Sequence, residues 1–148
     1  MTLVDGAELR PSRDAVQATT ATLDGVSRRV LAATGVARMT WTLRIPPHAS
    51  FRTWIGVLPV SGPPTTALFR IGVADDRVYE ELLMRRVNPV EEAGDRSWMP
   101  IDVDLRRYGG FQWSLFYRPG DHAWKVILNV STTGPGMAVW AEPTIRGG

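Results

Sequence analysis

The sequence predicts an all-β domain of the sandwich or barrel type. Apolar and polar residues alternate with a period of two along several short segments, a pattern typical of strands with one buried face. Clusters of Gly, Pro, Asp and Ser, such as SGPP, RPGD and STTGPG, separate these segments and favour tight turns. Many short strands joined by frequent turns indicate a β-sandwich or a barrel.

The chain of 148 residues has the length of one typical domain. We find neither an internal repeat nor a low-complexity linker, and therefore expect a single β-sandwich domain over residues 1–148. Residues 1–24 are expected to form an N-terminal strand or an extension of this domain.

The elements can be assigned in chain order from these patterns. The segment SRDAVQATTATL is only weakly patterned; Asp24 and Gly25 then favour a turn, and SRRVLAA is an expected strand. From Arg38 to Ile45 every second residue is apolar, which indicates a half-buried strand before Pro46. Six further segments are interpreted in the same way: Phe51 to Leu58, Thr66 to Val73, Met99 to Leu105, Phe111 to Arg118, Trp124 to Val130 and Met137 to Trp140.

One segment, Arg77 to Val87, does not follow the alternation. It contains strong helix formers, and its apolar residues fit helical spacing better than a period of two. Local propensity alone favours a helix here, so strand and helix both stay open at this point.

Composition excludes several classes of function. The formal net charge is only +2, with acidic residues interspersed among the basic ones, so we expect no nucleic-acid partner. No apolar run approaches the roughly 20 residues of a membrane span, so no membrane insertion is expected. The chain has no Cys, and MTLVDGAEL does not have the pattern of a signal peptide. The compartment is left open, and would be extracellular or periplasmic if the chain is part of a longer secreted protein.

Catalytic motifs are not found. His48 and His122 lie in turn contexts without metal-ligand spacing, and no nucleophile elbow or phosphate-binding loop occurs. Glu80 and Glu81 are adjacent, so on a strand they would point to opposite faces and could not flank one glycosidic bond. We therefore predict that the isolated chain is not an enzyme and needs no cofactor, although it could be an accessory domain of an enzyme.

Five stretches carry a family resemblance: GVSRRVLAA, WTLRIPPHASFRTWIGVLP, ALFRIGVAD, DRSWMPIDVDLRRYGG and AVWAEPTIR. In this order and spacing they resemble the galactose-binding-like jelly roll of carbohydrate-binding modules and of accessory domains in bacterial glycan-processing proteins. The resemblance implies a β-sandwich of two antiparallel sheets with eight or nine strands, and it favours a strand for Arg77 to Val87. It also implies that the strand containing Arg70 pairs with the strand containing Gln112 and Phe116, and that Trp54 belongs to the other sheet.

Related sandwiches often hold a structural calcium ion, which would need six to eight oxygen ligands. The candidate ligands are carboxylates, chiefly Asp75, Asp76 and Glu142, with Asp24, Asp102 and Asp104 as further oxygen donors.

The turn after Met99 to Leu105 has a structural interpretation. Asp104 faces away from the core, where its carboxylate can accept backbone N–H groups of the following turn. Tyr108 can then close one end of the core, and Gly109 and Gly110 allow the chain to reverse.

The aromatic residues give the best functional prediction. By alternation Trp41, Trp113 and Trp124 face inward, and Trp140 in the closing WAEP stretch is expected in the core. Sugars are typically held by an aromatic plane together with amide or guanidinium donors, and the outward residues offer these groups. The candidate ligand-binding residues are Trp54, Arg52, Trp98, Arg70, Gln112 and Phe116.

We therefore predict a non-catalytic carbohydrate-binding module, with Trp54 as the first choice for the stacking platform. The alternative is a protein-interaction or self-assembly domain of a larger assembly, in which the outward aromatic residues are buried against a partner. The oligomeric state is left open.

Overall fold

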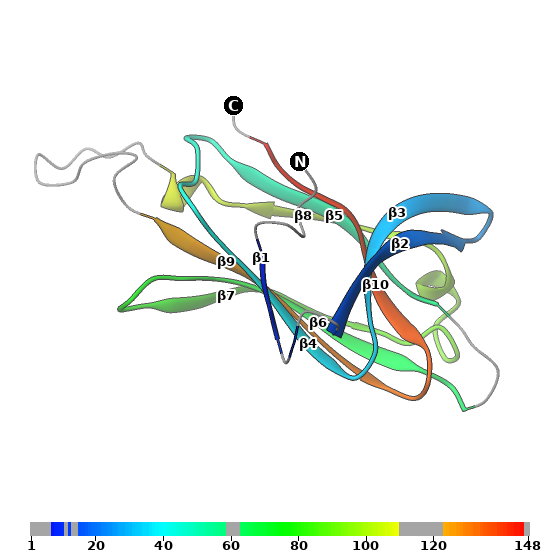
Figure 1. Ribbon diagram of the computed structural model, residues 1–148. Coiled ribbons are helices and arrows are strands. Elements are labelled where there is room, and N and C mark those ends of the chain that lie inside the picture. The colour runs from blue at the N-terminus through cyan, green and yellow to red at the C-terminus, as the bar shows by residue number, and fades with distance from the viewer. Residues whose placement is uncertain (1–6, 11, 13–14, 59–62, 110–122, 147–148) are drawn as a thin grey trace, which may run out of the picture.

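The computed structural model describes residues 7–10, 12, 15–58, 63–109 and 123–146. Their ten strands form two antiparallel sheets of five, which stack as two layers (Figure 1). Sheet I has the order β1 (Ala7–Arg10), β4 (Val36–Leu43), β9 (Trp124–Thr133), β6 (Thr66–Ala74) and β7 (Tyr79–Val87). Sheet II has the order β2 (Val16–Leu23), β3 (Val26–Ala33), β10 (Met137–Arg146), β5 (Ser50–Leu58) and β8 (Met99–Asp104). Two short 3-10 helices, η3 (Ala93–Arg96) and η4 (Arg106–Tyr108), flank β8.

The main core lies between the two sheets and is built from the inward residues of the alternating strands. Trp140 of β10 is fully buried and meets Phe69 of β6 edge to face, with ring centroids 4.9 Å apart. Trp41 of β4 is 7% exposed. Both tryptophans are core residues, as the alternation predicts for Trp41 and the family resemblance of the closing WAEP stretch implies for Trp140. Trp124 is half-buried and packs against this core.

The segment from Arg77 to Val87, which could have been a helix or a strand, contains the edge strand β7, as the resemblance implies. It pairs with β6 over nearly its whole length, with a register shift between Ile71 and Gly72. Leu83 of β7 packs against the main core. Pairing with β6 and this burial outweigh the helical propensity of the segment, since strand formation depends mostly on tertiary context.

The strand arrangement differs from the expected one at β6. The expected pairing of the Arg70 strand with the strand of Gln112 and Phe116 is wrong, because β9 and β7 occupy the two edges of β6. The N-terminal region, expected as a strand or an extension, contains β1 and β2; the bounds of β1 were not predicted, since its AELR sequence is too short to show a pattern. The expected strand Phe111 to Arg118, with Trp113, Gln112 and Phe116, lies outside the described residues.

The turn after β8 forms as the sequence predicts. The backbone N–H of Arg106 donates to Oδ1 of Asp104 at 2.9 Å, and the Arg106 side chain pairs with the same carboxylate. These hydrogen bonds lower the pKa of Asp104 below its usual value. Tyr108 is 5% exposed and stacks edge to face on Trp124, so it closes this end of the core.

Candidate functional site

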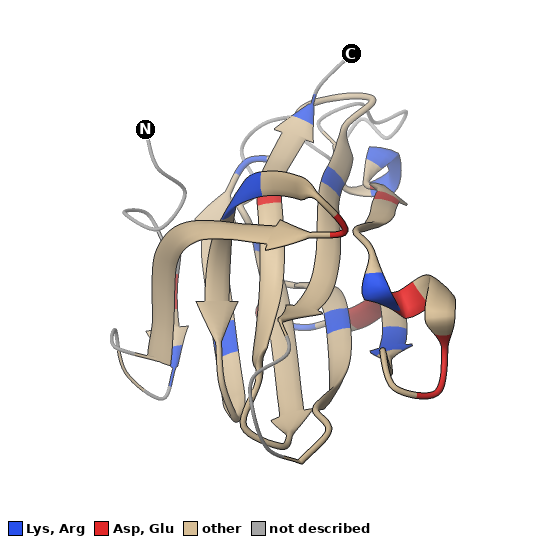
Figure 2. Cartoon of the chain, turned by 90° about the vertical axis from the view of Figure 1, so that its right-hand side faces the viewer, with Lys and Arg blue, Asp and Glu red and all other residues tan. Residues whose placement is uncertain are grey.

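The outer face of sheet II is covered by part of the chain itself. The hairpin of β2 and β3 turns at Asp24 and Gly25, whose φ angles of 49° and 77° are both positive. The hairpin extends past the edge of sheet II and then bends across the outer face of this sheet (Figure 2). The Leu23 side chain fills the space above Gly56 of β5 that a Cβ atom would need, and the Trp98 ring lies beside it.

A second, smaller apolar cluster lies beneath this cover. Its buried residues are small and aliphatic, and all belong to outward positions of sheet II: Ala21, Val30, Ala32, Val139 and Ala141. Trp54, Leu58, Trp98 and Met137 pack against it. This part of the outer face of sheet II is therefore a hydrophobic cluster rather than an open surface.

Trp54 faces outward, as the sequence predicts, but Arg28 of β3 covers its ring. The guanidinium carbon of Arg28 lies 3.8 Å from the Trp54 ring centroid and 5.8 Å from that of Trp98. Glu142 holds this guanidinium at 3.1 Å. The indole N–H of Trp98 donates to the carbonyl oxygen of Val26 at 2.8 Å, which ties the hairpin to the segment before β8. Both tryptophans thus have partners within the chain.

The other candidates split between two faces. Arg52 is exposed on sheet II, where it pairs with Asp102 at 3.1 Å. Arg70 lies on the outer face of sheet I, so the structure does not bring it together with Trp54. This separation into two faces agrees with the sequence interpretation.

The outer face of sheet I carries a row of polar side chains that crosses four strands and ends at Met84 on the fifth, β7. Arg10, Arg38, Asn129, Arg70 and Met84 are successive cross-strand partners and point to the same side. The Arg38 Nε donates to Oδ1 of Asn129 at 3.0 Å. The Arg70 Nε lies 3.6 Å from Oε1 of Glu81 on β7. Guanidinium, amide and carboxylate groups are thus aligned on one face.

An aromatic residue that the sequence interpretation missed lies beside this row. Tyr79 of β7 is 51% exposed, and its hydroxyl lies 2.6 Å from the position that a Cβ atom would take at Gly72. The phenol carbons Cζ and Cε2 lie within 2.8 Å of that position, so the ring lies over Gly72. Gly72 is two residues from Arg70 on β6 and therefore on the same face. Gly72 was the signal in the sequence that could have indicated this site, because glycine within a strand often marks a position where another group approaches the backbone closely.

The acidic residues proposed for calcium already have other partners or lie exposed. Asp75 caps a turn by accepting the N–H groups of Arg77 and Val78 at 2.8 Å, and Glu142 pairs with Arg28. Asp76 is exposed in the same turn as Asp75. Within the described ranges, no group of three or more His, Asp or Glu side chains could hold a metal ion. Calcium binding stays a prediction.

The two adjacent glutamates considered for catalysis point to opposite faces of β7. Glu80 accepts a hydrogen bond from the Tyr108 hydroxyl at 2.5 Å, whereas Glu81 faces Arg70 on the outer surface. Adjacent residues on a strand are expected to point to opposite faces, and these two glutamates do so. His48 is exposed in a turn, with a positive φ of 57°. His122 lies outside the described residues.

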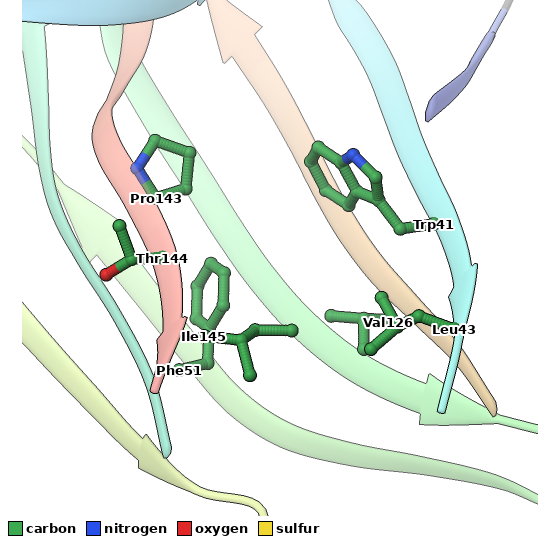
Figure 3. A pocket seen from close by; sticks show the side chains of 7 residues that line it. All are labelled: Trp41, Leu43, Phe51, Val126, Pro143, Thr144 and Ile145. Carbon is green, nitrogen blue, oxygen red and sulfur yellow. The ribbon is translucent and has the colours of Figure 1, made fainter. Parts of the chain in front are cut away.

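A small apolar pocket opens between the two sheets at one end of the sandwich (Figure 3). Sheet I contributes Trp41, Leu43 and Val126, and sheet II contributes Phe51, Pro143, Thr144 and Ile145. This lining has no charged or amide side chain that could orient a polar ligand, so the pocket is a gap in the core packing rather than a sugar site.

Within the described part of the chain, no helix is long and apolar enough to cross a membrane. No protein-family model and no curated protein sequence matches the chain.

Comparison with solved structures identifies the fold. The chain is similar to TmCBM61, solved in complex with β-1,4-galactotriose, with a TM-score of 0.58 and 9% identity over 96% of this chain and 88% of that one. It is similar to the xylan-binding domain CBM22-1 of a Paenibacillus barcinonensis protein, with a TM-score of 0.51 and 12% identity over 95% of this chain and 85% of that one. A third match is CBM28, a carbohydrate-binding module specific for non-crystalline cellulose, with a TM-score of 0.52 and 10% identity over 96% of this chain and 87% of that one.

These matches confirm the resemblance inferred from the sequence at the level of the fold. The chain has the jelly-roll β-sandwich of carbohydrate-binding modules.

Proposed function

We propose that the chain is a non-catalytic carbohydrate-binding module whose ligand lies on the outer face of sheet I. One observation carries this proposal: an exposed tyrosine ring, supported by Gly72, lies next to a cross-strand row of arginine and asparagine side chains. Tyr79 would stack on the C–H face of a sugar ring, and Arg70, Arg38 and Asn129 would bind its hydroxyl groups.

The chemistry of this face matches what a sugar requires. An aromatic ring provides an apolar plane of fixed orientation, and a small number of polar groups then fixes the position of the ligand. Arg70 is about half exposed at its side chain, so it can donate to a ligand without prior rearrangement. Because the polar row crosses four strands, the face suits an extended ligand that lies across the sheet.

The face with Trp54 fits this role less well. A sugar would have to displace the Arg28 guanidinium, which is stacked on the Trp54 ring and paired with Glu142. A charge that is both stacked and paired is costly to displace. The same contacts argue against Trp54 as a self-assembly surface, because the chain itself already covers the ring.

The test is a glycan-array screen followed by titration of the bound glycan against two variants. Tyr79→Ala is expected to weaken binding by about 1–3 kcal/mol, or roughly five- to 150-fold, and to leave the melting temperature nearly unchanged. Trp54→Ala, the matched control on the other face, should lower stability and leave the affinity of the folded protein unaltered. If no glycan binds at millimolar concentration while the chain forms a stable oligomer, the protein-interaction alternative is correct.

A further inference from the structure

We infer that the glycan bound on the outer face of sheet I is anionic and carries carboxylate or sulfate groups. This inference rests on the proposed function and adds the chemical class of the ligand to it. The arrangement of charge on the outward residues of the five strands supports it.

The row across sheet I contains three arginines, two of which are direct neighbours. Arg10 of β1 lies opposite Arg38 of β4, and Arg70 follows beyond Asn129. Like charges directly opposite each other on neighbouring strands are destabilising. A bound anion would relieve this repulsion, because it would place negative charge between guanidinium groups that the fold holds together.

Carboxylates of the chain neutralise only part of this charge. Glu8 pairs with Arg10, and Glu81 lies near Arg70, whereas Arg38 has the neutral amide oxygen of Asn129 as its partner. Lys125 and Arg86 are exposed on the same face, and in the described part of the chain neither has a carboxylate within ion-pair distance.

Sheet I thus presents five cationic side chains and two carboxylates on its outer face: Arg10, Arg38, Arg70, Arg86 and Lys125 with Glu8 and Glu81. The formal net charge of the whole chain is only +2. The excess of positive charge is therefore local, and it lies where an exposed aromatic ring is also available. A patch of one sign of charge concentrates ligands of the opposite sign.

The spacing of the arginines fits a repeating anion. Arg38 and Arg70 are two strands apart, which corresponds to about 10 Å across a sheet. This distance is comparable to a disaccharide repeat in an extended glycan. A polysaccharide with an acidic group on alternate sugars could therefore place successive anions at Arg38 and Arg70, and guanidinium groups bind carboxylate and sulfate through paired hydrogen bonds.

The test compares glycans that differ only in charge. Polygalacturonate is paired with its methyl-esterified form, and dextran sulfate with dextran, so the two pairs separate carboxylate from sulfate recognition. We expect at least one anionic member to bind about tenfold or more tightly than its neutral counterpart, with an affinity that falls as salt is raised.

Two charge-matched variants give the residue-level test. Arg38→Gln should weaken binding of the anionic glycan by about tenfold, as expected for loss of a charged hydrogen bond. Arg29→Gln, which removes an exposed charge from β3 of sheet II, should leave binding unchanged. Equal binding of neutral and anionic members, equal effects of the two variants, or equally tight binding of single-stranded DNA would each overturn the inference. In the first case the proposed function would still stand, whereas failure of every glycan to bind would reject both.

Discussion

Trp41 illustrates what alternation can establish for a single residue. Its parity within Arg38 to Ile45 predicts an inward side chain, and the structure buries it between the sheets beside Val126 and Phe51. Trp140 was expected in the core for a different reason, the family resemblance of its WAEP stretch, and it is also buried. For Trp54 the parity was also right, but parity states only which side a residue faces and not what lies on that side.

Truncation of Trp41 tests the assignment of the core. Trp41→Ala is expected to reduce the free energy of unfolding by about 3–5 kcal/mol, because it leaves a cavity that the neighbouring strands cannot fill. Thr42→Ala, at the adjacent outward position, should change stability by no more than about 0.5 kcal/mol. Urea denaturation of the two variants measures both values, and a similar small effect for each would show that the inward face is assigned wrongly.

Tyr108 predicts a loss of stability at alkaline pH. Burial and the hydrogen bond to Glu80 raise its pKa from 10.0 to about 12. Because the folded protein favours the neutral phenol, this contribution to stability is fully present below pH 10 and is lost as the pH rises toward about 12. Urea denaturation at about pH 8 and about pH 11 should therefore show a larger decrease for the wild type than for Tyr108→Phe. Equal decreases would mean that the Tyr108 phenol ionises as it does in the unfolded chain.

At the level of elements, Gly72 and Tyr79 form a unit that positions the proposed platform. Gly72→Ala would place a Cβ atom against the Tyr79 hydroxyl and ring, which can move because they are the far end of a side chain. We expect weaker glycan binding, comparable to that of Tyr79→Ala, with little change in melting temperature. Gly94→Ala is the matched control, since its added Cβ would meet nothing within 4 Å. Unchanged affinity for Gly72→Ala would remove Tyr79 from the binding site.

Most strands could be predicted from the sequence because each has one apolar parity and is bounded by turn residues. Strand β2 was harder, because Ala and Thr in VQATTATL give little contrast between its two faces. The course of the β2–β3 hairpin across sheet II could not be predicted, since it depends on long-range contacts of Leu23 and Val26 with Gly56 and Trp98. Because the sequence does not reveal that this hairpin lies over sheet II, Trp54 and Trp98 appeared available as ligand platforms.

The candidate site was predicted only in part. Arg70 was chosen as a donor for sugar hydroxyl groups, and its half-exposed side chain lies on the outer face of sheet I. Tyr79 was missed because its segment favours a helix locally, and Asn129 because an isolated asparagine in an apolar strand carries no signal until cross-strand partners are known. Register between distant strands, which aligns Arg38, Asn129 and Arg70, is not contained in any local pattern.

At the scale of the whole molecule, the two outer faces of the sandwich differ in kind. Sheet II supports a second apolar cluster under its own hairpin, and sheet I leaves a charged row and an aromatic ring exposed. A fold shared with carbohydrate-binding modules does not determine the face that binds a ligand, because function depends on the side chains that each chain places there. The difference between the faces is what assigns the proposed site to sheet I.

The central claim, that glycan binds to sheet I, is tested most directly by NMR titration of the labelled protein with a glycan identified by screening. We predict that the backbone amides of Arg70 and Gly72 and the side-chain amide of Asn129 shift as ligand is added. The indole N–H signals of Trp54 and Trp98 should stay in place. Shifts concentrated at these two indoles, with none at Gly72 or Asn129, would contradict the account and return the site to sheet II.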